Sequence, residues 1–173
     1  MADQEPNSGG NGADNGQPQV SILAQYVKDL SVENPSAPQV YSWQVQPNLD
    51  VQFNLNVQGA GEGVHEVSLK FDISARSDNG VHFVVDLTFA GLFALRNLPE
   101  EALPPFLMIE APRLLFPFAR QVISEAVSNT GFPPLLLDPI DFAAAYMAQV
   151  EAAQQQQASG PLGPTGQPAP EEA

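Results

Sequence analysis

The sequence predicts an α+β fold, in which a four-stranded antiparallel sheet, arranged as a meander, precedes a helical second half. Two observations carry this prediction. Between residues 49 and 89, three segments alternate apolar and polar residues with a period of two, which is typical of strands with one buried and one wetter face. After residue 98 the pattern changes to helical spacing, with proline near the predicted starts and glycine near a predicted end.

Residues 49–57, 66–74 and 81–89 are the clearest strands. Each carries apolar side chains at every second position, and residues two apart in a strand share a face. The shared faces hold Leu49, Val51, Phe53, Leu55 and Val57 in the first strand, Val67, Leu69, Phe71 and Ile73 in the second, and Val81, Phe83, Val85, Leu87 and Phe89 in the third. These side chains form the predicted sheet side of the core.

The connections between these strands carry hairpin signals. Residues 59–65 (GAGEGVH) are rich in glycine, and residues 74–82 (SARSDNGVH) contain Asp-Asn-Gly. An earlier strand runs through residues 20–33 with less regular alternation, and Pro35 and Pro38 end it. Together these signals predict the four-stranded meander.

Helices are predicted after the sheet. A short one begins near residues 98–101, with Pro99 in its first turn. Pro112 can open a long helix over residues 112–128, and Gly131 is placed near the C′ position that closes it.

The long helix carries Pro117 in its interior, where a proline removes one hydrogen bond and costs about 3 kcal/mol. Pro117 falls on a polar stripe, so the resulting bend is expected on the solvent side. The rest of the circumference is apolar over a wider arc than one sheet face requires, which predicts a second apolar partner, most simply another subunit. The apolar positions are Leu114, Leu115, Phe116, Phe118, Ala119, Val122, Ile123, Ala126 and Val127.

Low-complexity segments flank one predicted domain. Residues 1–18 are mostly Gly, Asn, Asp, Gln and Pro, and residues 156–173 form a Gly/Pro/Gln tail with an acidic tip, so both are predicted to be disordered. Residues 19–155 form the folded unit. It ends in an amphipathic helix from about Asp141 to Gln154, with Asp141 as N-cap or first-turn acid.

The composition narrows the class of partner. Twenty acidic residues against six basic ones give a formal net charge of -14, which disfavours nucleic acid and anionic lipid and favours basic partners. The absence of cysteine excludes disulfides and thiolate chemistry. The N-terminal residues lack the pattern of a signal peptide, so we expect a soluble, cytoplasmic protein without membrane insertion.

Few residues suggest catalysis. His82 and Asp86 share a strand face about 13 Å apart, and neither His65 nor His82 stands at a metal-ligand spacing. The acidic pair at residues 100–101 suits a helix start, and the glycine-rich residues 59–63 join two strands instead of opening a helix. No enzyme activity, cofactor or metal is predicted.

Four segments resemble one known family. They are YVKDLSVENPSAP (26–38), FVVDLTFAGLF (83–93), LLFPFARQVISEAVSNTGFPPLLLDPIDF (114–142) and the following AAAYM. In this order they are similar to SecB, the protein-export chaperone of Gram-negative bacteria. The resemblance implies a four-stranded antiparallel sheet with helices packed on one side, assembled as a homotetramer that is a dimer of dimers. It also implies a holdase that binds unfolded precursor proteins and delivers them to the SecA motor of the Sec pathway.

The resemblance also implies site residues. The SecA-binding surface maps to Asp29, Glu33, Val84 and Asp86, where Asp86 is shorter than the glutamate expected there, and the tail ending APEEA would be a weaker contact. The client groove maps to Tyr41, Trp43, Val45, Phe142, Tyr146 and Met147, with Trp43 as a substitute for the aromatic residue that Val45 replaces. The tetramer interface maps to Leu114, Leu115, Phe118, Val122 and Ile123.

A second interpretation stays open on the residues alone. A ligand carrier or small enzyme could enclose a pocket between a curved sheet and its helices. That protein would need an internal cavity with converging polar groups, whereas a holdase would need an external groove and oligomer contacts.

Overall fold

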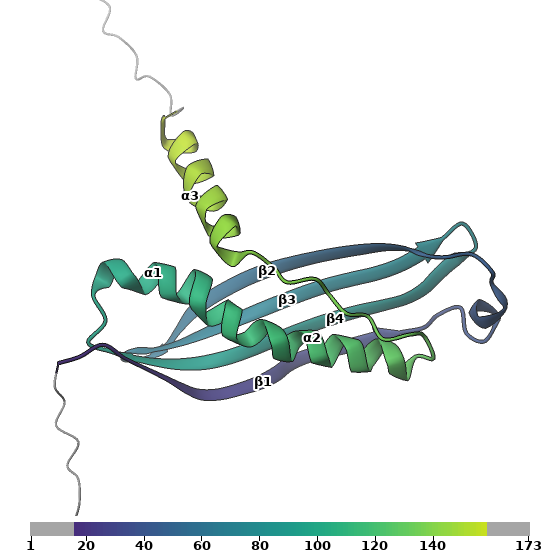
Figure 1. Ribbon diagram of the computed structural model, residues 1–173, viewed down its shortest axis with the longest axis horizontal. Helices are drawn as coiled ribbons and strands as arrows, with labels where there is room; N and C mark the ends of the chain where they lie inside the picture. Colours follow the sequence, from purple (N-terminus) through teal and green to yellow (C-terminus); the bar gives the residue numbers. More distant parts are fainter. Residues whose placement is uncertain (1–15, 159–173) are drawn as a thin grey trace, which may run out of the picture.

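The computed structural model describes residues 16–158, so most of both predicted tails lies outside the described residues. Within that range a single sheet is covered on one face by helix (Figure 1). The strands are β1 (Gln19–Glu33), β2 (Asn48–Gly61), β3 (Val64–Ser77) and β4 (Gly80–Arg96), and the helices are α1 (Leu103–Pro105), α2 (Ala111–Asn129) and α3 (Phe142–Ala158).

The strand order corrects the predicted meander. The sheet is antiparallel throughout, but its order is β1-β4-β3-β2, so β1 pairs with β4 and lies on the opposite edge from β2. Only β2, β3 and β4 follow one another through hairpins. Residues 34–47, which we call the crossover segment, carry the chain from one edge to the other at one end of the sheet (Figure 1). The result is a Greek-key order, because the first strand returns beside the last.

Two β-bulges explain the irregular alternation of β1. The pairing with β4 shifts by one residue between Ile22 and Ala24 and again between Val27 and Asp29. Each bulge inserts one extra residue, after which the same face can continue to receive apolar side chains. Val27 therefore lies opposite Phe89 and Leu30 opposite Leu87, on the face that α2 covers.

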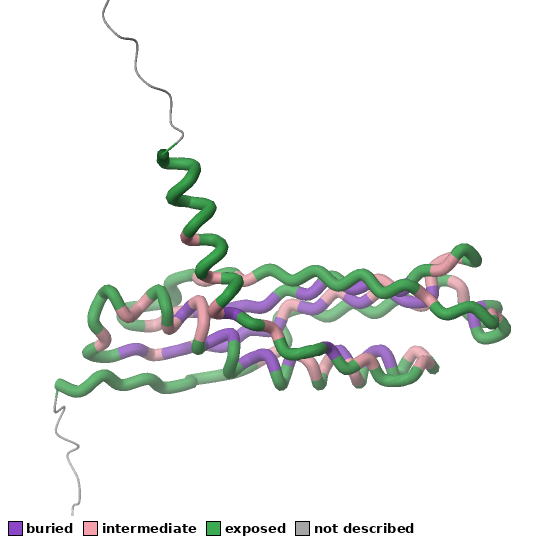
Figure 2. Tube along the Cα trace, turned by 45° about the horizontal axis from the view of Figure 1, so that its top comes forward, coloured by how far each residue is buried: buried purple, intermediate pink, exposed green. Residues whose placement is uncertain are grey.

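The core lies between α2 and the two central strands. The predicted inward residues of β3 are all buried, as are those of β4 from Phe83 to Phe89, which confirms their assignment. Leu49, Val51 and Phe53 of β2 share this face but stay exposed, because α2 does not reach the edge strand. Figure 2 shows the same division, with buried residues along β3, β4 and α2 and exposed residues along most of β1 and β2.

The helical half begins near Pro99, as predicted, but it continues without the break expected before Pro112. Helical backbone is continuous from Glu100 through α1 and a π-helical turn, η3 (Phe106–Glu110), into α2, so Pro112 does not open the long helix. The Ala111 N–H donates to the Phe106 carbonyl five residues back. This wider turn accommodates Pro112, which has no N–H to donate.

The predictions for Pro117, Gly131 and Asp141 hold, but α3 is not amphipathic, because Phe142 is its one buried residue. Pro117 is exposed on the solvent side of α2, and Gly131 follows the helix with a φ of 87°, which only glycine adopts readily. The Asp141 Oδ1 accepts a hydrogen bond from the Ala144 N–H at 2.9 Å and caps α3. Since α3 continues to Ala158, residues 156–158 of the predicted disordered tail are helical.

Gly91 allows α2 to approach the sheet closely. A Cβ atom at this position would lie 2.6 Å from Leu115 Cδ2 and 3.0 Å from Phe93 Cε2. Both neighbouring side chains are fully buried, so one of them would have to shift within the packed core to admit the added methyl group.

We therefore expect Gly91→Ala to lower the free energy of unfolding by about 1–3 kcal/mol, the usual cost of overpacking a core. Urea denaturation at one fixed chain concentration measures it. Gly59→Ala in β2 is the matched control, because nothing lies within 4 Å of its added Cβ. In a Leu115→Ala background the cost of Gly91→Ala should largely disappear; an equal cost in both backgrounds would contradict the close contact.

Candidate binding surfaces

A hollow, which we call the crossover pocket, opens at the crossover end of the sheet. Its walls come from the crossover segment, from the start of β4 and from the residues after α2. The Trp43 ring lies edge-on to the His82 ring at 5.0 Å, and Phe132 lies 5.4 Å from Phe83. The lining residues include Tyr41, Trp43, Val45, Pro47, His82, Phe83, Phe132, Pro134 and Leu135. The structure thus brings three of the predicted groove residues together.

His82 and Phe132 were not assigned a role from the sequence. His82 is buried at this pocket, and its Nε2 lies 2.9 Å from the Ser77 hydroxyl. The sequence spacing did not predict that His82 would lie beside Trp43, because the path of the crossover segment brings the two residues together. Phe132 belongs to the GFPPLLLDPIDF motif, which was the available signal.

A second hollow, which we call the α3 pocket, lies between β2 and the start of α3. Phe53, Met108, Phe142 and Tyr146 are among its lining residues. Phe142 is buried with its ring 6.1 Å from both Phe53 and Phe116, so it anchors α3 to the protomer. Met147, also predicted in the groove, is exposed on α3 and does not line this pocket.

An apolar strip on β2 connects the two hollows. Leu49, Val51 and Phe53 are 44%, 39% and 40% exposed on the helix-covered face, and they span about 13 Å. Val45 and Pro47 of the crossover pocket immediately precede this strip, and Phe53 lines the α3 pocket. Within the described residues, the outer edge of β2 has no paired strand. The two pockets and the strip between them therefore follow one another along the β2 side of the sheet, beside its free edge.

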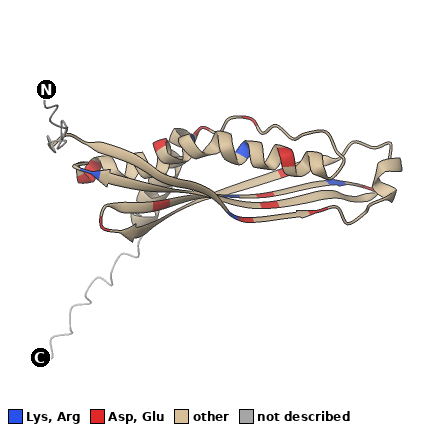
Figure 3. Cartoon of the chain, turned by 90° about the horizontal axis from the view of Figure 1, so that it is seen from below, with Lys and Arg blue, Asp and Glu red and all other residues tan. Residues whose placement is uncertain are grey.

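The opposite face of the sheet is open and acidic. Glu33 lies directly opposite Val84 and Ser31 opposite Asp86, so the four predicted SecA-binding residues gather on this face of β1 and β4. Asp72 lies opposite Asp86, and the acidic row continues to Asp50 on β2. Figure 3 shows the acidic residues along these strands. Asp50 and Asp72 were not assigned, although alternation places both on the polar side of their strands.

Burial and neighbouring charges shift the pKa values of two acidic residues on the open face. Partial burial raises the pKa of Asp86; Lys70, 3.8 Å away, opposes this increase, whereas the nearby Asp72 and Asp29 add to it. Glu66 is the contrary case, because hydrogen bonds from Lys28 and Tyr26 hold its pKa below the usual glutamate range. These bonds also tie β1 to β3 across β4.

The exposed side of α2 forms a third apolar surface with β1. Leu114 and Phe118 are 44% and 49% exposed, and Val122 is partly buried. Leu115 and Ile123, predicted with them as interface residues, are instead fully buried in the protomer's own core. The surface continues onto Ile22, Val27, Leu30 and Val32 of β1, which are exposed on the same side.

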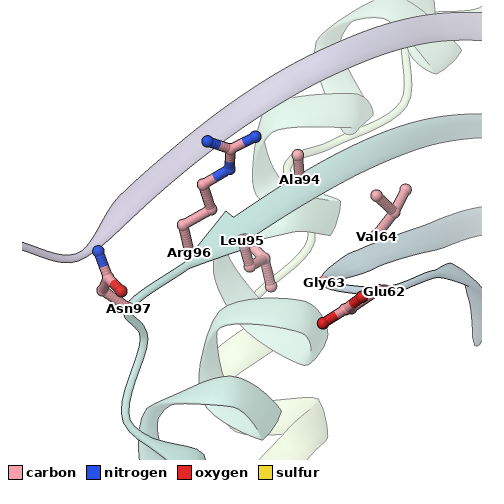
Figure 4. Close-up of a pocket in the computed structure, with 7 residues that line it drawn as sticks. All are labelled: Glu62, Gly63, Val64, Ala94, Leu95, Arg96 and Asn97. Carbon is pink, nitrogen blue, oxygen red and sulfur yellow. The ribbon is translucent and has the colours of Figure 1, made fainter. Parts of the chain in front are cut away.

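The described residues offer little that could hold a metal or start a reaction. They contain no group of three or more His, Asp or Glu side chains placed to hold a metal ion. A further hollow at the other end of the sheet is lined by Glu62, Arg96 and Asn97, and Figure 4 shows that the Arg96 side chain points away from Glu62. Among the described helices none is long and apolar enough to cross a membrane.

The fold and its surfaces define a binding protein, with apolar pockets and exposed apolar residues on one face of the sheet and acidic residues on the other. Residues 13–154 match the SecB family, described as preprotein translocase subunit SecB. The protein-export protein SecB of Zymomonas mobilis is 58% identical over 134 residues, covering 78% of this chain and 82% of that protein. Its counterpart from Sphingopyxis alaskensis is 52% identical over 157 residues, covering 91% and 90%.

A solved structure shares the fold at lower identity. The Mycobacterium tuberculosis Rv1957 SecB-like chaperone, in complex with a ChAD peptide from the Rv1956 HigA1 antitoxin, has a TM-score of 0.57 and 18% identity, covering 70% of this chain and 90% of that one. The family model and the two bacterial relatives identify the family of this chain as well as its fold. This chain belongs to the SecB family of protein-export chaperones, which confirms the resemblance found in its sequence.

Proposed function

We propose that this chain is a cytoplasmic holdase that binds unfolded precursor proteins in its groove, keeps them translocation-competent and delivers them to SecA. The observation that carries this proposal is the series of exposed apolar residues on β2 that lies between the crossover pocket and the α3 pocket, and we propose that these together form the groove. An extended client could add to the free edge of β2 through backbone hydrogen bonds, while its side chains enter the apolar hollows. Such contacts select weakly for sequence, as a chaperone of many precursors requires.

The location of the apolar surface argues against a carrier or enzyme with an internal pocket. Packed side chains such as Phe71, Leu87 and Leu115 occupy the space between α2 and the sheet. The hollows lie outside this core, and the family is one of chaperones. This arrangement supports our proposal of a non-enzymatic function.

We expect Leu49→Ser with Val51→Ser to weaken binding of an unfolded precursor about tenfold, because two partly exposed aliphatic contacts are lost. Fluorescence anisotropy with a labelled, non-refolding precursor measures the Kd. Gln52→Ser, on the opposite face of the same strand, should leave it unchanged. An unaltered Kd in the double variant, at unchanged thermal stability, would refute the groove.

The open acidic face is the proposed SecA-docking surface. Asp29, Glu33 and Asp86 lie on neighbouring strands around Val84, and they would attract a basic surface and accelerate encounter. The acidic tail ending APEEA lies outside the described residues and stays a weaker proposed contact.

Asp29→Lys with Asp86→Lys should weaken SecA binding by tenfold or more, on the order of the cost of like-charge contacts, and leave aggregation suppression intact. Surface plasmon resonance at two salt concentrations reports the affinity and its charge dependence. Glu62→Lys with Glu151→Lys changes the net charge equally away from this face and is the control. Equal SecA affinity in all three proteins would show that docking occurs elsewhere.

The apolar surface of α2 and β1 is the proposed subunit contact of a homotetramer built as a dimer of dimers. Its candidates are the accessible residues Leu114, Phe118 and Val122, whereas Leu115 and Ile123 support them from the core. Exposed aromatic and aliphatic side chains over a helix and an edge strand are typical of surfaces that a second subunit covers.

Val122→Asp should shift the mass measured by native mass spectrometry from four chains towards two, because a charge would be buried without a partner. Ser128→Asp adds the same charge at an exposed position near the end of α2 and should leave the tetramer intact. If Val122→Asp retains the mass of four chains, α2 does not form the contact.

A further inference from the structure

The Tyr41 side chain makes two kinds of contact at the mouth of the crossover pocket. Its ring packs beside the Phe132 ring at 5.7 Å between centroids. A Cβ added to Gly131 would lie only 3.1 Å from the Tyr41 ring. Its hydroxyl, by contrast, points to the end of α2 and donates to the Thr130 carbonyl at 2.6 Å. The ring of Tyr41 therefore lines the pocket, whereas its hydroxyl attaches the residue to the end of α2.

Asn34 completes the connection. Its Nδ2 donates to the Tyr41 hydroxyl at 2.7 Å and to the same Thr130 carbonyl at 3.2 Å. Asn34 begins the crossover segment and Tyr41 lies in its middle, so the two bonds to the Thr130 carbonyl join this segment to the C-terminal end of α2. The Thr130 carbonyl follows the last turn of the helix, where carbonyl groups have no partner within the helix.

The crossover segment has few other attachments to α2. Val40 is its one fully buried residue, and Tyr41 is half exposed. The segment nevertheless supplies Trp43 and Val45, which form one wall of the pocket opposite His82 and Phe132. Trp43 also packs against His82 and Gly80 of β4, so the bonds to Thr130 are the attachment of this wall on the helix side.

We propose that Tyr41 is a positioning residue, whose hydroxyl, with Asn34, holds the crossover segment against the end of α2 and thereby keeps the crossover pocket formed. This inference rests on the proposed function of the groove and assigns to Tyr41 a role separate from contact with client. When the bonds to Thr130 break, the segment moves away, Trp43 separates from His82, and the fraction of binding-competent pocket falls. The apparent affinity falls by the same fraction.

Trp43 is the one tryptophan of the chain, so its fluorescence reports on this wall alone. Tyr41→Phe keeps the ring and removes only the hydroxyl. We expect acrylamide quenching of Trp43 to increase severalfold and the Kd for an unfolded precursor to rise about threefold to tenfold, the effect of one net hydrogen bond. Hydrogen exchange should accelerate in residues 34–47, with the thermal midpoint and the exchange of β3 and β4 unchanged.

Asn34→Ala should have the same effects, and the double variant should add little, because both side chains act on the Thr130 carbonyl. Tyr146→Phe removes a hydroxyl at the α3 pocket and is the matched control, with no change in Trp43 quenching expected. If wild-type chain binds precursor but Tyr41→Phe leaves Trp43 quenching and Kd unaltered, the positioning role is wrong. If wild-type chain binds no precursor, the proposed groove itself fails, whatever the quenching shows.

Discussion

One helix covers a sheet that is wider than the helix, and the rest of the structure depends on this mismatch. An α-helix with its side chains is about 10–12 Å across, whereas strands lie about 4.8 Å apart, so α2 can bury two neighbouring strands but not four. Gly91 seats Leu115 close to the sheet and directs α2 over β3 and β4. The apolar faces of the two edge strands are left uncovered.

The uncovered edges have different surroundings. Beside β2, the crossover segment and the start of α3 each form a pocket, and an exposed apolar strip lies between them. Beside β1, the exposed residues of α2 extend the apolar surface into a broad patch suited to another subunit. The reverse face of the sheet receives the acidic residues. In the proposed function, client, second subunit and SecA would each bind a separate one of these surfaces.

Periodicity predicted much of this arrangement. The three alternating strands, the long helix with Pro117 on its solvent side, the Gly131 terminus and the Asp141 cap depend on local pattern, and each is present. Pattern was weaker where the chain departs from regular geometry. The bulges near Leu23 and Lys28 obscured the two faces of β1, and the π-helical turn accommodated a Pro112 that was expected to open the helix.

The functional surfaces were likewise predictable only in part from local sequence. Tyr41, Trp43 and Val45, which were grouped from one short stretch of chain, line one pocket, and alternation correctly put Asp86 on the polar side of its strand. The strand order, the buried positions of Leu115 and Ile123, and the approach of Trp43 to His82 depend on contacts between residues far apart in the chain. The amino-acid sequence thus determined which residues are apolar, acidic or turn-forming. Only tertiary structure decided which apolar residues the single helix would bury and which it would leave for partners, because that choice depends on the width of the sheet and the path of the crossover segment.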